Sequence, residues 1–188
     1  NREMYGLSVK PPHPPNLWKS VSMKSSSTYS FQADTGEKIL RRSLYSFWKR
    51  AMPPPQMTIF DAPTRESCIA RRERTNTPLQ ALVLMNEEQY FMAAKKLALK
   101  LIQSFDDDQQ RIDYLYQSLT ARKPDAAESK LLADGLAQLR AGYREDQELT
   151  KLITGDLPVE QTEDRIEFAA LSALINSVLN LDVAKTRD

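Results

Sequence analysis

The spacing of apolar residues in the second half of the chain is the feature that most restricts how it can fold. After Asn86, apolar side chains recur every three or four positions, with polar residues between them. This period matches the α-helix and gives each helix one apolar face. Three such faces comprise Tyr90, Ala94, Leu97, Ala98, Leu101 and Phe105, then Ile112, Leu115, Tyr116 and Leu119, and then Leu131, Leu132, Leu136 and Leu139. The pattern predicts a mainly α fold, a bundle of five or six helices with little sheet.

The last apolar segment, from about 160 to 181, differs because its apolar positions cover most of the helix circumference. They are Ile166, Phe168, Ala170, Leu171, Leu174, Ile175, Val178 and Leu179. A helix that is apolar on nearly every side has to be buried, so we expect it to be the central helix of the bundle. Asn176 and Asn180 would then be partly buried amides that need hydrogen-bond partners.

Two of the expected helix starts carry clear capping residues. Thr77-Pro78 places threonine at the N-cap and proline at the first helical position. Asp125 and Glu128 have the spacing of a capping box. Residues 75–86 carry no charge, so we expect the short helix that Thr77 caps to be buried.

The N-terminal third is irregular and rich in proline and arginine. Residues 1–37 include the segment VKPPHPPNLW, which favours an extended arm laid along a surface, with Trp18 as a surface aromatic. The helical period begins after this arm. We therefore divide the chain into an irregular arm, 1–37, and a helical domain, 38–188.

The helical domain is expected to begin with a helix that a triple proline ends. Leu40, Leu44, Phe47 and Trp48 fall on one helical face. The prolines at 53–55 lack amide donors, so they terminate such a helix. After them we expect a long basic loop, 53–77, and loops of this length are usually functional or firmly held.

The sequence lacks the common catalytic and cofactor motifs. It contains one histidine, His13, and one cysteine, Cys68, and neither a C-x-x-C-H nor an H-E-x-x-H motif. We expect no haem and no metal in this chain, and no catalytic residue can be assigned. Cys68 is expected to be a small buried apolar residue. No run of eighteen apolar residues occurs, so we expect no membrane span.

Charge is unevenly distributed along the chain. Residues 38–74 carry nine Lys and Arg against three Asp and Glu, and residues 87–188 carry thirteen against nineteen. One interpretation is that the two segments attract each other within one fold. The other is that the basic segment forms an anion-binding surface, for a partner or an acidic polysaccharide. We do not expect nucleic acid, because the pI near 8.0 is modest and no nucleic-acid-binding motif occurs.

The candidate site residues lie in and beside the long loop. Bidentate pairs between arginine and carboxylate hold irregular backbone well, so these residues are predicted to clamp the loop. In the alternative, the arginines and Asn76 face a ligand or a partner domain. The candidates are Asp61, Arg65, Glu66, Arg71, Arg72, Arg74 and Asn76.

Four motifs resemble those of a known family. RRSLYSFWKR, PPP, FDAPTRESC and RRERTNTPLQALVLMN are similar to the signature of a planctomycete-type C-terminal domain of unknown function. The resemblance runs from about 9 to 181. It implies a domain of a large exported protein, periplasmic or at the cell surface, that often carries cytochrome c-like modules. Any haem would then lie elsewhere in that protein, and the resemblance gives no residue a role.

The sequence is compatible with two functions. The first is an interaction or assembly module that packs on other domains of the parent protein through the segment 41–77. The second is part of a polysaccharide-processing or redox enzyme whose site is completed by other domains.

Overall fold

The computed structural model describes residues 3–71, 73–155 and 162–186. Helices make up 59% of the structure, and the described residues contain no strand. The predicted mainly helical fold is therefore confirmed. The chain divides into two compact units, Asn1–Thr75 and Asn76–Asp188.

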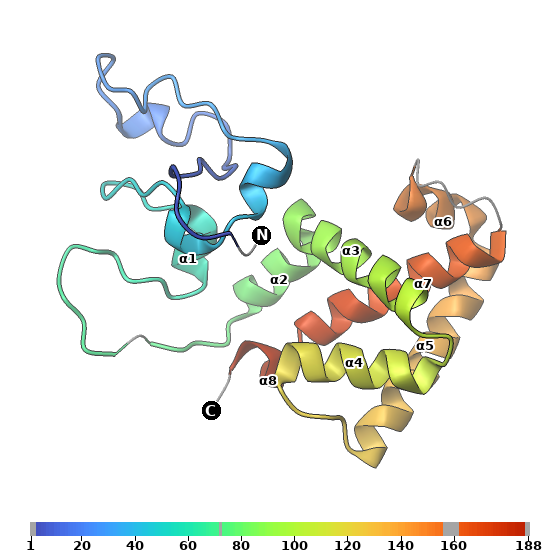
Figure 1. Ribbon diagram of the computed structural model, residues 1–188. Helices are drawn as coiled ribbons and strands as arrows, with labels where there is room; N and C mark the ends of the chain where they lie inside the picture. Colours follow the sequence, from blue (N-terminus) through green and yellow to red (C-terminus); the bar gives the residue numbers. More distant parts are fainter. Residues whose placement is uncertain (1–2, 72, 156–161, 187–188) are drawn as a thin grey trace. The chain divides into compact units, whose positions relative to one another are not determined.

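The second unit is a helical bundle organised around α7 (Figure 1). Besides α7 (Thr162–Leu179), it consists of α2 (Pro78–Asn86), α3 (Glu88–Ser104), α4 (Asp108–Thr120), α5 (Ala126–Glu145), α6 (Gln147–Thr154) and α8 (Asp182–Lys185). Each of these six helices contacts α7. The predicted central position of the last helix is confirmed, although its predicted start near 160 lies outside the described residues.

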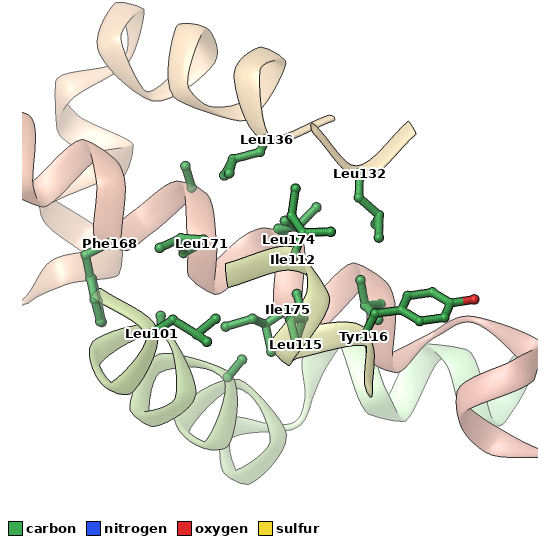
Figure 2. Packing of buried hydrophobic residues seen from close by; sticks show 14 residues of the cluster. Leu101, Ile112, Leu115, Tyr116, Leu132, Leu136, Phe168, Leu171, Leu174 and Ile175 are labelled. Atoms are coloured by element: carbon green, nitrogen blue, oxygen red, sulfur yellow. The ribbon is translucent and has the colours of Figure 1, made fainter. Parts of the chain in front are cut away.

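The apolar core of this unit is built from four helices, as Figure 2 shows. Leu101 of α3, Ile112 and Leu115 of α4 and Leu136 of α5 point toward the side chains of α7. From α7 itself the core takes Phe168, Ala170, Leu171, Leu174, Ile175 and Val178. Most of these positions match the apolar faces expected from the helical period. Leu131 is an exception, because it was expected on the apolar face of α5 but is 73% exposed.

Asn176 and Asn180 are amides on the otherwise apolar α7. Asn176 is 8% exposed, and Asn180 donates from Nδ2 to the Asn176 carbonyl oxygen at 3.2 Å. Both Oδ1 atoms are buried without a hydrogen-bond partner among the described residues. The expectation that these amides are partly buried is confirmed, whereas their acceptors are left without donors.

The short helix α2 begins as predicted but is not buried. Thr77 and Gln80 form a reciprocal capping box, with Thr77 Oγ1 accepting from the Gln80 amide at 3.3 Å. One face is buried, yet Leu79, Leu82 and Met85 on the other are 53%, 56% and 61% exposed. The expectation of burial is wrong because a lack of charge does not require burial, and much of a protein surface is apolar.

A network of four charged side chains joins α4, α5 and α7. Arg140 of α5 contacts Asp108 through Nη1 at 2.5 Å and Glu167 of α7 through Nε at 2.6 Å. Arg111 of α4 also contacts Glu167, at 2.8 Å. Three of the four side chains are at least three-quarters buried. Pairs of this kind fix how the three helices are aligned.

A second polar group surrounds the start of α5, where the predicted capping box of Asp125 and Glu128 is confirmed. Glu128 Oε1 accepts from the Tyr116 hydroxyl at 2.5 Å and from Arg122 Nη2 at 2.6 Å. Figure 2 shows the Tyr116 hydroxyl pointing away from the apolar cluster. Hydrogen bonds from Arg122, and then from Tyr116, lower the pKa of Glu128 to about 2. Desolvation, and then Glu128, raise the pKa of Tyr116 to about 12.

We expect Tyr116 to ionise near pH 12 in the folded chain, against about 10 for an ordinary tyrosine. Because the folded pKa is the higher one, its stabilising effect is complete below pH 10 and is lost as the pH rises through 12. Ultraviolet absorbance titration of the wild type and of Tyr116→Phe isolates this phenol. If the absorbance change that disappears in the variant has its midpoint near pH 10, the raised pKa of Tyr116 would be contradicted.

The first unit has little regular structure. It contains three 3-10 helices, Lys19–Val21, Gly36–Leu40 and Ser43–Tyr45, and the five-residue α1, Pro55–Ile59. The helix expected before the triple proline is therefore wrong. Instead, Phe47 donates its amide to the Val9 carbonyl, and Val9 donates to the Tyr45 carbonyl, both at 2.7 Å. Pairing with the arm draws this segment into extended backbone. The segment 53–77 is largely loop, apart from α1, where Pro55 occupies a first-turn position that tolerates proline.

Trp18 is the centre of a small core in this unit and not a surface aromatic. It is fully buried, and its ring lies 4.4 Å from Phe31 and 5.5 Å from Phe47 between centroids. Its indole N–H donates to the Met52 carbonyl at 2.9 Å. The prediction failed because the proline-rich arm folds back on the segment before the triple proline, a long-range contact that no local pattern reveals.

Candidate functional site

Arg65 and Glu66 are both held by residues from the segment before the triple proline. The Arg65 guanidinium lies over the Trp48 ring, 4.5 Å from its centroid, a cation–π contact. Glu66 accepts a bidentate pair from Arg50, at 2.8 and 3.1 Å. The hydrogen bonds from Arg50 lower the pKa of Glu66. Both members of this pair are more than half exposed, so it contributes little stability.

Asp61 joins the two ends of the exposed part of the loop. Its carboxylate accepts from the Thr75 amide and from the Thr75 hydroxyl, both at 2.8 Å. Asp61 also has a left-handed backbone, with φ of 56°, which aspartate tolerates better than most residues. The clamp expected of Asp61 thus includes Thr75, a partner that charge-based reasoning did not consider.

Between these two ends the chain is displayed to solvent. Every described residue in 64–76 is exposed. Arg71 and Arg74, with Glu73 and Thr75, line a hollow of about 480 Å³. Arg72 lies outside the described residues. The segment therefore presents basic side chains on irregular backbone, and we call residues 64–76 the exposed loop.

Cys68 lies in the exposed loop and is itself exposed. The expectation that it is buried is wrong, because the loop does not turn its small apolar residues inward. The neighbouring Ile69 is 49% exposed. The loop thus combines apolar and cationic side chains, a mixture that protein interfaces favour.

Arg74→Ala is expected to change the free energy of unfolding by less than about 1 kcal/mol, because ion pairs of exposed side chains contribute little. Thermal denaturation of the variant and the wild type measures this. A loss of about 3 kcal/mol or more would instead show that Arg74 clamps a desolvated carboxylate.

Asn76 belongs to the second unit, where its side chain makes two hydrogen bonds to α8. Its Nδ2 donates to Asp182 Oδ1, and its Oδ1 accepts from Lys185 Nζ, both at 2.6 Å. These contacts join the start of α2 to α8.

Sequence reasoning missed a second group of polar residues in the first unit. Lys49 donates from Nζ to the hydroxyls of Ser22 and Thr28, the latter at 2.8 Å. These residues line a cavity of about 530 Å³ together with Trp48 and Arg50. The hydroxyl-rich run Ser25 to Thr28 was a visible signal. The helical period did not reveal this group, because it predicts that Lys49 lies on the polar face of a helix.

Comparison with protein families identifies a matching family. A family model described as PSD1, protein of unknown function (DUF1553), matches residues 1–136. The chain belongs to this family. The match covers the whole first unit and the second unit as far as Leu136 of α5. No curated protein and no solved structure matches the chain.

Membership of the PSD1 family establishes a domain of unknown function and assigns no chemistry to any residue. Within residues 3–71, 73–155 and 162–186, no three His, Cys, Asp or Glu side chains are grouped to hold a metal ion. No helix in the same residues is long and apolar enough to cross a membrane.

The purified PSD1-family chain is expected to contain neither haem nor stoichiometric metal, because its sequence lacks the ligand spacing for both. Visible absorbance and elemental analysis test this. A Soret band, or one zinc per chain, would contradict the expectation.

Proposed function

We propose that this PSD1-family domain is an interaction module of a larger exported protein, and that the exposed loop docks on an acidic surface of another domain of that protein. The observation that carries the proposal is that the loop is exposed to solvent although its ends are held together. All its described residues are exposed, while its ends are held together by Asp61 and Thr75. Binding residues are disproportionately found on loops, and long irregular loops in compact proteins are commonly functional.

The composition of the loop supports an acidic partner surface. Arg71 and Arg74 supply positive charge beside the apolar Ile69, and the wider segment 38–74 has nine basic against three acidic residues. Arginines with an apolar neighbour are frequent hot spots in interfaces, and charge complementarity speeds association. The docking surface therefore corresponds to the later part of the 41–77 segment.

The cellular context rests on the family resemblance. It supports a planctomycete-type protein in the periplasm or at the cell surface, with cytochrome c-like modules elsewhere in the chain. In such a protein this domain would hold neighbouring modules together and take no part in chemistry itself.

A second candidate function is that the domain forms part of a polysaccharide-processing or redox enzyme, whose active site is completed by other domains. The observation that favours it is the cavity beside Trp48 and Lys49, which pairs an aromatic ring with a cation and hydroxyl groups. This combination suits an acidic saccharide better than a protein surface.

Photo-crosslinking in the full-length protein tests the first proposal. Benzoylphenylalanine in place of Ile69 is expected to crosslink to a peptide outside residues 1–188. The same probe in place of Leu131, which is 73% exposed on α5, is the matched control. Arg74→Glu should reduce the crosslink from position 69. Crosslinks confined to residues 1–188, or equal yields at both positions, would contradict the proposal.

A further inference from the structure

The cavity of about 530 Å³ in the first unit lies between two segments that are distant in sequence. Six residues of the arm form one part of its lining, namely Val21, Ser22, Met23, Ser25, Ser26 and Thr28. The other part is formed by Phe47, Trp48, Lys49 and Arg50. The cavity is a hollow that is wide open to solvent, and its volume falls within the range of about 300–1,000 Å³ that small-molecule sites occupy. A single inorganic ion would fill only a small part of it.

Lys49 is a cation without a carboxylate partner among the described residues. Its described hydrogen bonds go to Ser22 Oγ and Thr28 Oγ1. Hydroxyl groups accept hydrogen bonds but do not neutralise charge, and an ammonium has three donors, so one remains for an external acceptor. Arg50 is paired with Glu66, and the lining of the cavity includes no acidic side chain among the described residues. The cavity therefore has a net positive lining.

The hydroxyls are held in a connected group. Thr28 Oγ1 lies 2.9 Å from both Ser22 Oγ and Ser26 Oγ. Ser22 Oγ already donates to the Trp18 carbonyl at 2.5 Å, so the hydroxyls left to meet those of a sugar are Ser25, Ser26 and Thr28.

Two aromatic residues, Phe47 and Trp48, also line the cavity. Arg65 covers one face of the Trp48 ring, so the other face and Phe47 remain for apolar contact with a sugar ring.

We infer that this cavity binds an acidic sugar, with the carboxylate or sulfate group on Lys49 and the ring hydroxyls facing the serine and threonine side chains. The inference does not rest on the interaction role, and it deepens the second candidate function by naming the ligand class of the same cavity. The residues concerned lie outside the exposed loop.

The test measures binding by the full 188-residue chain with isothermal titration calorimetry. The probes are digalacturonate, a sulfated galactose disaccharide, inorganic sulfate and neutral lactose. Lys49→Gln is expected to weaken the binding of an acidic disaccharide at least about tenfold, as loss of a charged hydrogen bond does. Lys24→Gln, at an exposed position of the same arm outside the cavity lining, is the matched control and should bind like wild type.

A second pair of variants guards against misfolding of Lys49→Gln. Ser25→Asp adds a carboxylate at an exposed position in the cavity lining, and should abolish binding through repulsion without disturbing the fold. Ser27→Asp adds the same charge two residues away, outside the lining, and should retain most of the affinity.

Selective loss of binding in Lys49→Gln and Ser25→Asp would support the site, and the preferred acidic disaccharide would distinguish a uronate from a sulfate group. The inference is overturned if no acidic disaccharide binds, if both controls lose affinity equally, or if lactose binds as tightly. Equal affinity for inorganic sulfate would overturn the sugar assignment. Weak, salt-sensitive binding in all variants would also overturn it.

Discussion

Leu171→Ala or Leu174→Ala is expected to lower the free energy of unfolding by about 2–5 kcal/mol, the range typical of large-to-small substitutions in a packed core. The two side chains are 1% and 4% exposed and lie on α7 within the apolar cluster. Removing three carbon atoms at either position leaves a cavity that the surrounding helices cannot readily fill. Because α7 contacts every other helix of the unit, the lost packing has no local substitute.

Chemical denaturation followed by circular dichroism at 222 nm measures this effect, since α2–α8 provide most of the helical signal. Leu131→Ala is the matched control. Leu131 is 73% exposed on α5, so the same chemical change there should cost less than about 0.5 kcal/mol. A cost below about 0.5 kcal/mol at both Leu171 and Leu174 would show that α7 is not the centre of the bundle.

Arg140→Met is expected to destabilise the second unit by about 3 kcal/mol. This is the lower end of the range for breaking a buried ion pair, because Arg140 and Glu167 retain about a quarter and a fifth of their side-chain exposure. Methionine keeps the apolar stem but leaves Asp108 and Glu167 with fewer donors. Arg144→Met, one turn further along α5, is the control. Its pair with Glu163 is 58% and 70% exposed, so the loss should stay below about 1 kcal/mol.

Acid should remove the difference in the free energy of unfolding between Arg140→Met and the wild type. Hydrogen bonding to Arg140 is the largest cause that lowers the pKa of Asp108 below its usual value. A depressed folded pKa stabilises the protein above the unfolded pKa, which is about 3.9, and this contribution is lost as the pH falls through the folded value. The two proteins should therefore differ most near pH 7 and converge at strongly acid pH. A difference that is constant between pH 7 and pH 3 would show that packing, and not charge, is lost.

The helices and core of the second unit were predictable because they depend on patterns among residues close together in the sequence. Helical periodicity placed Leu101, Leu115 and Leu174 in the core, and the capping patterns at Thr77 and Asp125 were confirmed. Such features depend on residues close together in sequence, which fix both the helix and its buried face.

The first unit was less predictable because its structure depends on distant contacts. Trp18 is buried by Phe31 and Phe47, and Val9 pairs with the backbone around Ser46. Neither contact has a periodic signature. For the same reason the cavity around Lys49 was missed, since its lining joins the arm to the segment before the triple proline.

The sequence grouped the candidate residues of the loop but did not predict all their partners. Arg65 contacts the Trp48 ring, and the described partner of Glu66 is Arg50. Charge counting identified a basic segment, yet it could not distinguish an arginine that stacks on an aromatic ring from one displayed to solvent.

Amide hydrogen exchange of residues 64–76 tests the proposed interaction role most directly. The comparison is between the 188-residue chain alone and the larger protein of which we propose it to be a domain. The exposed loop has few backbone hydrogen bonds among the described residues and should exchange rapidly in the chain alone. Docking on another domain should slow exchange at least about tenfold in the full-length protein, while α7 amides stay equally protected in both. Equally rapid exchange of the loop in both proteins would contradict the account.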